Sequence, residues 1–205
     1  MKLYYSAGSC STSDHIVLEW ADASYELVRL TRDEKQSPEY LALNPAGAVP
    51  TLVDGDFVVT QNAAIYGYIA DSYPQAGLFG DGSGRQRAEA TRWISYVSSD
   101  VHPAFKPLFA PARYGASGDC AGQVRTAALT NVAATLTLAE NRLSDREWLA
   151  GFRSPADAYL YITLRWATAM QIELTANLAA FLARVEGDEK VRKVLSMEEL
   201  DPVAS

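Results

Sequence analysis

The sequence has 205 residues, of which 48% are hydrophobic and 21% charged, a balance typical of a folded globular protein and not of a disordered or collagen-like chain. Its 18 basic and 25 acidic residues give a formal charge of −7, which would repel a phosphate backbone and predicts no nucleic acid partner. No apolar run approaches the roughly 20 residues of a membrane-crossing helix and the N-terminus turns polar too early for a secretory signal, so we expect a cytoplasmic protein with no membrane partner.

The first third of the chain alternates between strand and helix patterns. The expected strands are residues 2–5, 25–30, 51–53 and 57–59, and the expected helices are residues 10–21, 37–43 and 62–69. Ser37 followed by Pro38 supplies a cap and a first-turn proline for the second helix. Gly55 lies in a short turn between the last two strands, which predicts an antiparallel hairpin. The predicted order is β-α-β-α-β-β-α.

After residue 74 no strand pattern appears. Residues 75–84 contain four glycines and predict a linker between two domains, residues 1–76 and 84–205. The expected helices beyond it are residues 85–109, bent by Pro103 and Pro107, then 124–143 and 155–170. Ser154 and Asp157 form a capping box that opens the last of these, and that helix is apolar nearly all round, as at the centre of a bundle. The sequence therefore predicts an α/β domain followed by an all-α domain.

The two cysteines stand in different contexts. Cys10 follows a predicted strand and loop and begins a helix, where unpaired N–H groups and the positive dipole end would favour its thiolate. The alternative is a small buried hydrophobic residue. Cys120 lies in a Gly-rich loop without comparable surroundings. Because the cysteines form no C-x-x-C pair and only two histidines are present, we expect neither a disulfide nor a metal site.

Two further segments carry candidate ligand contacts. If the Val49–Pro50 bond is cis, the backbone N–H and C=O of Val49 would be free to pair with a peptide-like ligand, although most X-Pro bonds are trans. Gln61 and Asn62 begin a predicted helix, where side-chain amides and N–H groups could hold a carboxylate. Asn62 could equally be only an N-cap.

These segments, in this order and spacing, resemble the glutathione transferase family. The motifs are the Cys10 loop, Asn-Pro-Ala-Gly-Ala-Val-Pro-Thr-Leu at 44–52, Thr-Gln-Asn-Ala-Ala-Ile at 60–65, Trp-Leu-Ala-Gly at 148–151 and the capping box at 154–159. The cysteine region at 9–16 and Leu-Arg-Trp-Ala at 164–167 look most like the bacterial beta class. The likeness covers essentially the whole chain.

The resemblance implies a thioredoxin-like N-terminal domain, an all-helical domain with a second-substrate pocket, a homodimer, and reduced glutathione bound between the domains as co-substrate. It implies the following roles: Cys10 at the glutathione sulfur, Val49 before a cis Pro50 at the cysteinyl backbone, Gln61 and Asn62 at the γ-glutamyl end, Lys35 at the glycine carboxylate, His102 on the second-domain wall, and Asp100 at the γ-glutamyl amine of the neighbouring subunit's ligand.

Several of these residues have competing interpretations. Ser11, beside Cys10, could hold the glutathione thiolate with its hydroxyl, as Ser does in other classes. His102, a lone histidine within a predicted helix, fits a structural role as well as a catalytic one. Phe105 and Trp166 could line an apolar second-substrate pocket, or could belong to the core, since both have helical spacing.

The sequence departs from the family pattern at two points. Gln61 stands where the family usually has an acidic residue, and Pro103 stands where beta-class members often have a lysine. We expect a glutathione transferase that conjugates the glutathione thiolate to apolar electrophiles, with thiol–disulfide exchange through Cys10 as a further activity. The alternative is a non-catalytic member that binds apolar ligands or protein partners, which the altered Gln61–Asn62 pair keeps open.

Overall fold

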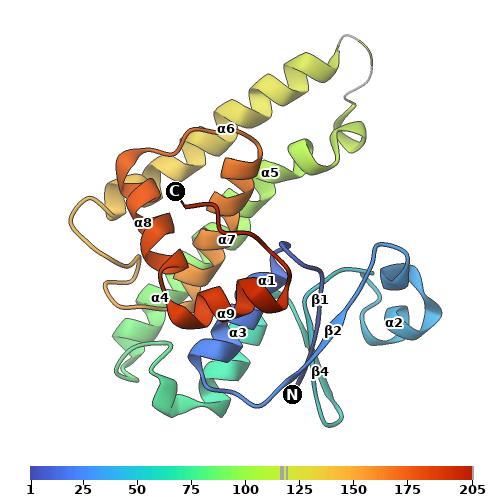
Figure 1. Ribbon diagram of the computed structural model, residues 1–205, viewed down its shortest axis with the longest axis vertical. Helices are drawn as coiled ribbons and strands as arrows, with labels where there is room; N and C mark the ends of the chain where they lie inside the picture. Colours follow the sequence, from blue (N-terminus) through green and yellow to red (C-terminus); the bar gives the residue numbers. More distant parts are fainter. Residues whose placement is uncertain (116–117, 119, 205) are drawn as a thin grey trace.

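A mixed sheet of four strands organises the first third of the chain in the computed structural model, which describes residues 1–115, 118 and 120–204 (Figure 1). The strands are β1 (Lys2–Tyr5), β2 (Glu26–Arg29), β3 (Thr51–Asp54) and β4 (Phe57–Thr60), in the order β2-β1-β3-β4. β1 is parallel to β2 and antiparallel to β3. β3 and β4 form the predicted hairpin, and Gly55 takes the positive φ of 61° that its turn requires.

Helices cover both faces of this sheet (Figure 1). α1 (Ser11–Trp20) and α3 (Asn62–Ser72) lie on one face, and α2 (Pro38–Leu43) lies on the other, after a short 3-10 turn, η1 (Glu34–Gln36). Ser37 caps α2 by accepting the Tyr40 N–H over 3.2 Å, with Pro38 in the first turn. The β-α-β-α-β-β-α order predicted from the sequence is confirmed.

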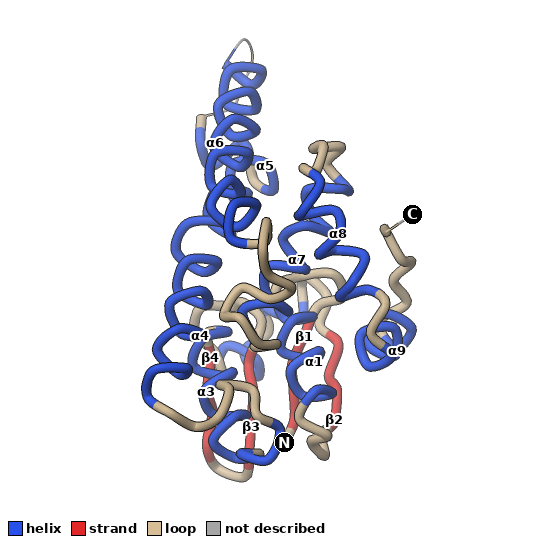
Figure 2. Tube along the Cα trace, turned by 90° about the vertical axis from the view of Figure 1, so that its left-hand side faces the viewer, coloured by secondary structure: helices blue, strands red, loops and turns tan. Residues whose placement is uncertain are grey.

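The rest of the described chain is helical (Figure 2). Its elements are η2 (Pro74–Ala76), α4 (Gly84–Tyr96), η3 (Val97–Val101), α5 (His102–Phe109), η4 (Pro111–Tyr114), α6 (Cys120–Arg142), α7 (Pro155–Ala169), α8 (Ala176–Glu186) and α9 (Glu189–Met197). α5 and α6 form an arm that projects from the body (Figure 1). The α/β part followed by an all-α part therefore confirms the predicted fold class.

The helix expected over residues 85–109 is interrupted. Residues 97–101 form a π-helical turn, η3, which joins α4 to α5. Pro103 lies in the first turn of α5, where its missing N–H is tolerated, and Pro107 lies inside the helix. π-turns shift the face on which later residues lie, and they occur often at functional sites. The residues after this turn belong to the site described below.

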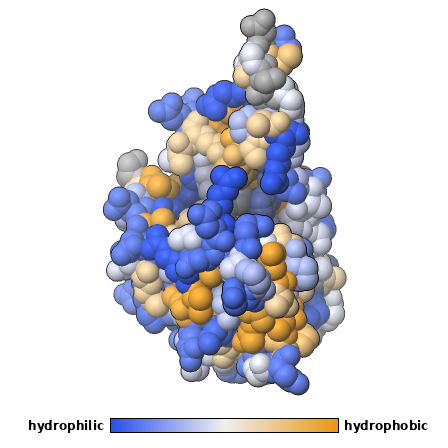
Figure 3. Space-filling view, turned by 90° about the vertical axis from the view of Figure 1, so that its right-hand side faces the viewer, coloured by the Kyte–Doolittle hydropathy of each residue, from blue (hydrophilic) through white to orange (hydrophobic). Residues whose placement is uncertain are grey.

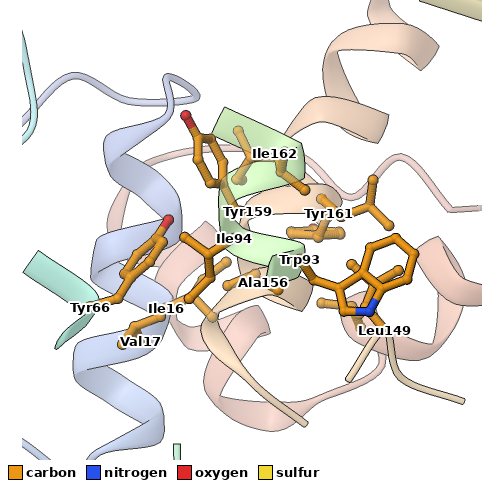
Figure 4. Packing of buried hydrophobic residues seen from close by; sticks show 14 of the residues in the cluster. Ile16, Val17, Tyr66, Trp93, Ile94, Leu149, Ala156, Tyr159, Tyr161 and Ile162 are labelled. Carbon is orange, nitrogen blue, oxygen red and sulfur yellow. The ribbon is translucent and has the colours of Figure 1, made fainter. Parts of the chain in front are cut away.

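α7 connects the two parts of the molecule. Its residues are buried on almost every side, as the apolar sequence predicts, and the Ser154–Asp157 capping box opens it. Figure 4 shows α7 side chains, including those of Tyr159 and Ile162, in one hydrophobic cluster with Ile16 of α1 and Tyr66 of α3. Because this shared core holds the sheet and the helical part together, a site between them has rigid walls.

The chain returns to α1 after α9. Glu198 is fully buried there, and its carboxylate accepts hydrogen bonds from the Gly8 N–H at 3.2 Å and the Thr12 hydroxyl at 2.7 Å. The same carboxylate lies 2.9 Å from Nδ1 of His15. The end of the chain therefore fastens the loop that precedes Cys10. None of the helices in the described ranges is long and apolar enough to span a membrane.

Candidate active site

A cavity of about 350 Å³ lies where the sheet part meets the helical part. Cys10, Val49, Pro50, Gln61 and Asn62 line it from the sheet part, and Ser98, His102, Pro103, Lys106 and Tyr159 line it from the helical part. Figure 3 shows this side of the molecule hollowed between the lower, sheet-containing part and the helical arm above it. Motifs that are far apart in the sequence therefore share one space.

Cys10 is the last residue before α1 and is half-buried in the cavity wall. Its thiol donates to the backbone carbonyl of Val49 over 3.5 Å. Burial, and then the Asp14 carboxylate one turn further on, raise the pKa of the Cys10 thiol to about 12. The expectation of a thiolate at the helix N-terminus is therefore wrong for the ligand-free protein, because desolvation outweighs the helix dipole.

Ser11 does not reach the cavity, so its predicted role at the glutathione sulfur is wrong. The residue is fully buried, and its hydroxyl donates to the Ser6 carbonyl over 3.3 Å. It also accepts the Ser6 N–H at 3.1 Å and lies 2.7 Å from the Ser9 hydroxyl. One residue further along a helix the side chain turns by about 100°, which carries Ser11 away from the cavity side of Cys10.

The Val49–Pro50 peptide bond is cis, which is the alternative that the resemblance implied. Asn44 and Tyr40 fix the segment before it, because the Asn44 amide donates to the Ala48 carbonyl at 2.7 Å and the Tyr40 hydroxyl donates to it at 2.5 Å. The backbone of Val49 is thereby held at the cavity wall beside Cys10.

The turn into α3 presents Gln61 and buries Asn62. Gln61, and not Asn62, occupies the N-cap, so the N-cap interpretation of Asn62 is wrong; Gln61 has a φ of 71°, uncommon for a residue other than glycine. The Asn62 amide points back into α1, where it donates to Asp14 at 2.7 Å and to the Cys10 carbonyl at 3.1 Å. Its side chain joins α3 to α1, so the backbone N–H groups at this helix end and the exposed Gln61 amide are the groups that can meet an anion in the cavity.

Asp14 lies directly behind this contact. The residue is fully buried, and its second carboxylate oxygen, Oδ1, has no hydrogen-bond partner within the part of the chain that the structure describes. Burial raises the pKa of the Asp14 carboxyl well above its usual range. Lys35, on η1, is half-buried and does not line the cavity, although its charge acts to lower the pKa of Cys10.

The helical wall is built from one face of η3 and α5. Ser98, His102 and Lys106 follow one another at intervals of four residues, and all three line the cavity. Nδ1 of His102 lies 2.7 Å from the hydroxyl of Tyr159 on α7. Burial, and the charge of Lys106, lower the pKa of His102 to about 4, so its imidazole is neutral at pH 7.

Sequence reasoning missed Lys106 and Tyr159. Lys106 brings a positive charge to the wall on which Pro103 replaces the lysine of the family pattern, and its spacing from His102 was a signal that could have revealed it. Tyr159 lies on a helix that is apolar nearly all round, where no periodicity distinguishes a residue that faces a cavity.

Phe105 and Trp166 belong to the core and not to the cavity lining, so their predicted place in an apolar pocket wall is wrong. Phe105 is fully buried. Trp166 is 9% exposed and its indole nitrogen donates to the Gly8 carbonyl over 2.8 Å. Phe109, one turn after Phe105, is 50% exposed and packs edge-on against Trp166 with ring centres 5.0 Å apart. Asp100 is exposed on η3, where it accepts a hydrogen bond from Ser99 over 2.6 Å.

Comparisons with known proteins agree with this geometry. The family model described as "Glutathione S-transferase, N-terminal domain" matches residues 1–71. A glutathione S-transferase of Xanthomonas campestris is 45% identical over 204 residues, which cover 98% of this chain and 100% of that protein. The chain belongs to the glutathione S-transferase family.

Solved structures of this family superpose on nearly the whole transferase. A glutathione S-transferase from Xylella fastidiosa is 44% identical with a TM-score of 0.94, covering 98% of this chain and 99% of that one. A beta-class enzyme from Sphingomonas chungbukensis and a sphingomonad enzyme in complex with glutathione are 34% and 33% identical, with TM-scores of 0.87 and 0.86. Each covers 98% of this chain and 100% of its own. The resemblance to the beta class is thereby confirmed.

Within the described residues, no group of three or more His, Cys, Asp and Glu side chains is placed to hold a metal ion.

Proposed function

We propose that this transferase binds reduced glutathione in the cavity between its two parts and joins the glutathione sulfur to a carbon atom of an apolar electrophile. In this reaction the thiol proton is lost to solvent, a sulfur–carbon bond forms, and the leaving group of the electrophile departs with the bonding electron pair. The observation that carries the proposal is the cavity itself, which brings the Cys10 thiol, the Val49 backbone and the His102 imidazole around one space of about 350 Å³.

The two walls supply groups that suit the parts of glutathione. The N-terminus of α3, at Gln61 and Asn62, suits the γ-glutamyl carboxylate, because helix-end N–H groups bind anions. The backbone of Val49 suits the central peptide unit. Lys35 and Lys106 supply the positive charges near the cavity that suit the glycine carboxylate.

Cys10 acts in this proposal as a hydrogen-bond donor to the glutathione thiolate and not as the nucleophile, and its S–H turns from the Val49 carbonyl to the thiolate when glutathione binds. Its raised pKa keeps the thiol protonated at pH 7, and a neutral S–H next to a developing thiolate stabilises that charge. Neutral His102 faces the same space from the other wall. The apolar electrophile would then meet Phe109, whose half-exposed ring lies against Trp166 beside the site.

We keep thiol–disulfide exchange through Cys10 as a second activity, because its sulfur lies on the cavity wall. The attacking species is the thiolate, which the raised pKa of Cys10 makes scarce at pH 7, so we expect this exchange to be slow and to speed up as pH rises. In that step Cys10–SH and oxidised glutathione give the mixed disulfide Cys10–S–S–glutathione and one reduced glutathione, which balances atoms and electrons. Intact-mass measurement after incubation with oxidised glutathione tests it. An adduct on wild type and on Cys120→Ser, but not on Cys10→Ala, supports exchange at Cys10, and an adduct that survives in Cys10→Ala rejects it.

We also propose that the transferase is a homodimer in which Asp100 reaches the γ-glutamyl amine of the ligand in the neighbouring subunit. Two observations support a second copy. The edge strand β4 leaves Phe57 48% and Val58 36% exposed, apolar side chains on its two faces that a partner would cover, and Asp100 is exposed. Cytoplasmic location remains a prediction, which the two free cysteines support.

The dimer proposal is tested by light scattering and by glutathione titration. Asp100→Asn should weaken glutathione binding roughly 10-fold to 150-fold, since a charged hydrogen bond contributes about 1.5 to 3 kcal/mol, while the dimer mass stays unchanged. A monomeric wild type, or unchanged affinity in the variant, would reject this role for Asp100.

Retention on immobilised glutathione followed by an assay with a reactive aryl halide tests the main proposal. Retention with turnover supports conjugation. Retention without turnover of any electrophile in a panel supports a non-catalytic member that binds apolar ligands or protein partners.

A further inference from the structure

Tyr159 is a buried tyrosine that lines the cavity and whose hydroxyl is hydrogen-bonded to a second lining residue, His102. It is 3% exposed, lies on α7 and lines the cavity together with Cys10. Figure 4 shows its hydroxyl at the edge of the hydrophobic cluster, on the same side as that of Tyr66. Within residues 1–115, 118 and 120–204, the only hydrogen-bond partner of this hydroxyl is Nδ1 of His102, at 2.7 Å.

The aromatic surroundings of His102 fix its ring. The imidazole lies edge-on to Trp166, with ring centres 4.9 Å apart, and edge-on to Tyr159 at 5.8 Å. Trp166 is itself fastened, because its indole nitrogen donates to the Gly8 carbonyl. Tyr159 and Trp166 stand two turns apart on α7, so a helix that is buried on almost every side sets the orientation of the imidazole.

The hydrogen bond between Tyr159 and His102 can run in two directions, and one of them leaves the buried phenol O–H without an acceptor. Both groups are neutral at pH 7, since burial lowers the pKa of His102 to about 4 and raises that of Tyr159. If His102 donated from Nδ1, the nearly fully buried phenol O–H would have no acceptor in the described structure, which is costly. If Tyr159 donates instead, the remaining proton is on Nε2 of a half-buried ring that lines the cavity.

We propose that Tyr159 is a positioning residue for conjugation: its hydroxyl donates to Nδ1 of His102, fixes the tautomer with a proton on Nε2, and so directs that N–H at the sulfur of bound glutathione. The inference rests on the proposed binding of glutathione in this cavity. A neutral imidazole N–H stabilises the thiolate without adding a buried charge, and a donor fixed before the reaction needs no reorganisation.

The wild-type protein gives the first test. The chain has two histidines, so a long-range ¹H–¹⁵N spectrum contains two imidazole systems, and His102→Phe assigns them. We expect His102 in the form with the proton on Nε2 across pH 6 to 8. A proton on Nδ1 would overturn the inference, and this measurement does not depend on the folding of any Tyr159 variant.

The second test separates positioning from structural support. Tyr159→Phe keeps the ring and removes the hydroxyl, so we expect the pKa of enzyme-bound glutathione, measured by thiolate absorbance, to rise by about one unit. Conjugation at pH 6.5 should fall roughly tenfold. Binding of S-methylglutathione, which has no thiol, should change less than about twofold. In a His102→Phe background the same substitution should have no further effect on the thiol pKa.

Tyr161→Phe is the matched control. Tyr161 lies on the same helix, is fully buried and donates to Glu186 over 2.8 Å, away from the cavity. The Tyr161→Phe variant should be less stable than wild type, while the pKa of its bound glutathione should be unchanged. If wild type binds no glutathione, the proposed function itself fails. If wild type lowers the thiol pKa and Tyr159→Phe does not raise it, only the role of Tyr159 is rejected.

Discussion

The backbone N–H of Gly8 and the carboxylate of Glu198 are joined by a 3.2 Å hydrogen bond across 190 positions of sequence. The Gly8 carbonyl is held from the other side by the Trp166 indole at 2.8 Å. Gly8 has a φ of 70°, and it stands two residues before Cys10. The helical part of the molecule therefore fixes the backbone of the loop that leads into the active site.

Glu198→Ala should destabilise the protein by about 3 to 5 kcal/mol, because it leaves three buried or half-buried partners, Gly8, Thr12 and His15, without their acceptor. Denaturant unfolding measures this loss. Glu199→Ala is the neighbouring control, since Glu199 is 77% exposed and pairs with Arg29 at the surface. It should change the unfolding free energy by less than about 1 kcal/mol. Equal losses in the two variants would contradict the buried anchor.

Cys10 should resist alkylation at pH 7 in the ligand-free protein, since a thiol whose pKa is about 12 is almost entirely protonated there. Iodoacetamide should modify the exposed Cys120 first, as peptide mapping would show. The rate at Cys10 should then rise about tenfold per pH unit through pH 8 to 10. A rate at Cys10 that levels off below pH 8 would show that the pKa of this thiol lies below 8, and would contradict the prediction.

Asp14 should make stability depend on pH. Its carboxyl has a raised pKa in the folded protein, so the protonated form is favoured by folding. The stability that protonated Asp14 contributes is fully present below the pKa of an unfolded aspartate, about 3.9. It is lost as pH rises through the higher pKa that Asp14 has in the folded protein. The unfolding free energy of Asp14→Asn relative to wild type should therefore increase with pH above about 4. Parallel pH curves for Asp14→Asn and wild type would reject the assignment.

Lys106 should contribute to glutathione affinity. Lys106→Met removes an exposed positive charge from the cavity wall, so we expect Kd for glutathione to rise roughly two- to fivefold at low salt, the effect of about 0.5 to 1 kcal/mol. Titration calorimetry at two salt concentrations measures it, and the difference should shrink at high salt. Lys190→Met, which breaks a surface pair with Asp22, is the control and should leave Kd unchanged. The same Kd for Lys106→Met and wild type would remove Lys106 from the site.

The sequence predicts the order of strands and helices through local residue spacing. It also predicts that the Cys10, Val49 and Gln61 segments meet in one site, because the family resemblance implies it. The protonation state of Cys10 could not be predicted, since the raised pKa of its thiol depends on burial and on the nearby Asp14 carboxylate, which only the folded chain creates. The direction of Ser11 depends on where α1 begins to turn, and a one-residue error in helix phase changes its surroundings entirely.

The π-turn at 97–101 explains another part of what the sequence did not reveal. Two prolines follow it, and the periodic pattern alone predicted one bent helix, while the extra residue in the turn sets which side chains face the cavity. The roles of Phe105 and Trp166 were ambiguous because core residues and pocket walls have the same helical spacing. Burial, which decides between the two, is a property of the whole fold.

A crystal structure with reduced glutathione tests the central claim most directly, because the claim is one of place. The account predicts one glutathione per chain in the cavity between the sheet and helical parts, its sulfur within hydrogen-bond reach of Cys10 and of Nε2 of His102, its central peptide unit paired with the Val49 backbone, and its γ-glutamyl carboxylate at the N-terminus of α3. Glutathione bound elsewhere, or with its sulfur turned away from Cys10 and His102, would contradict the account.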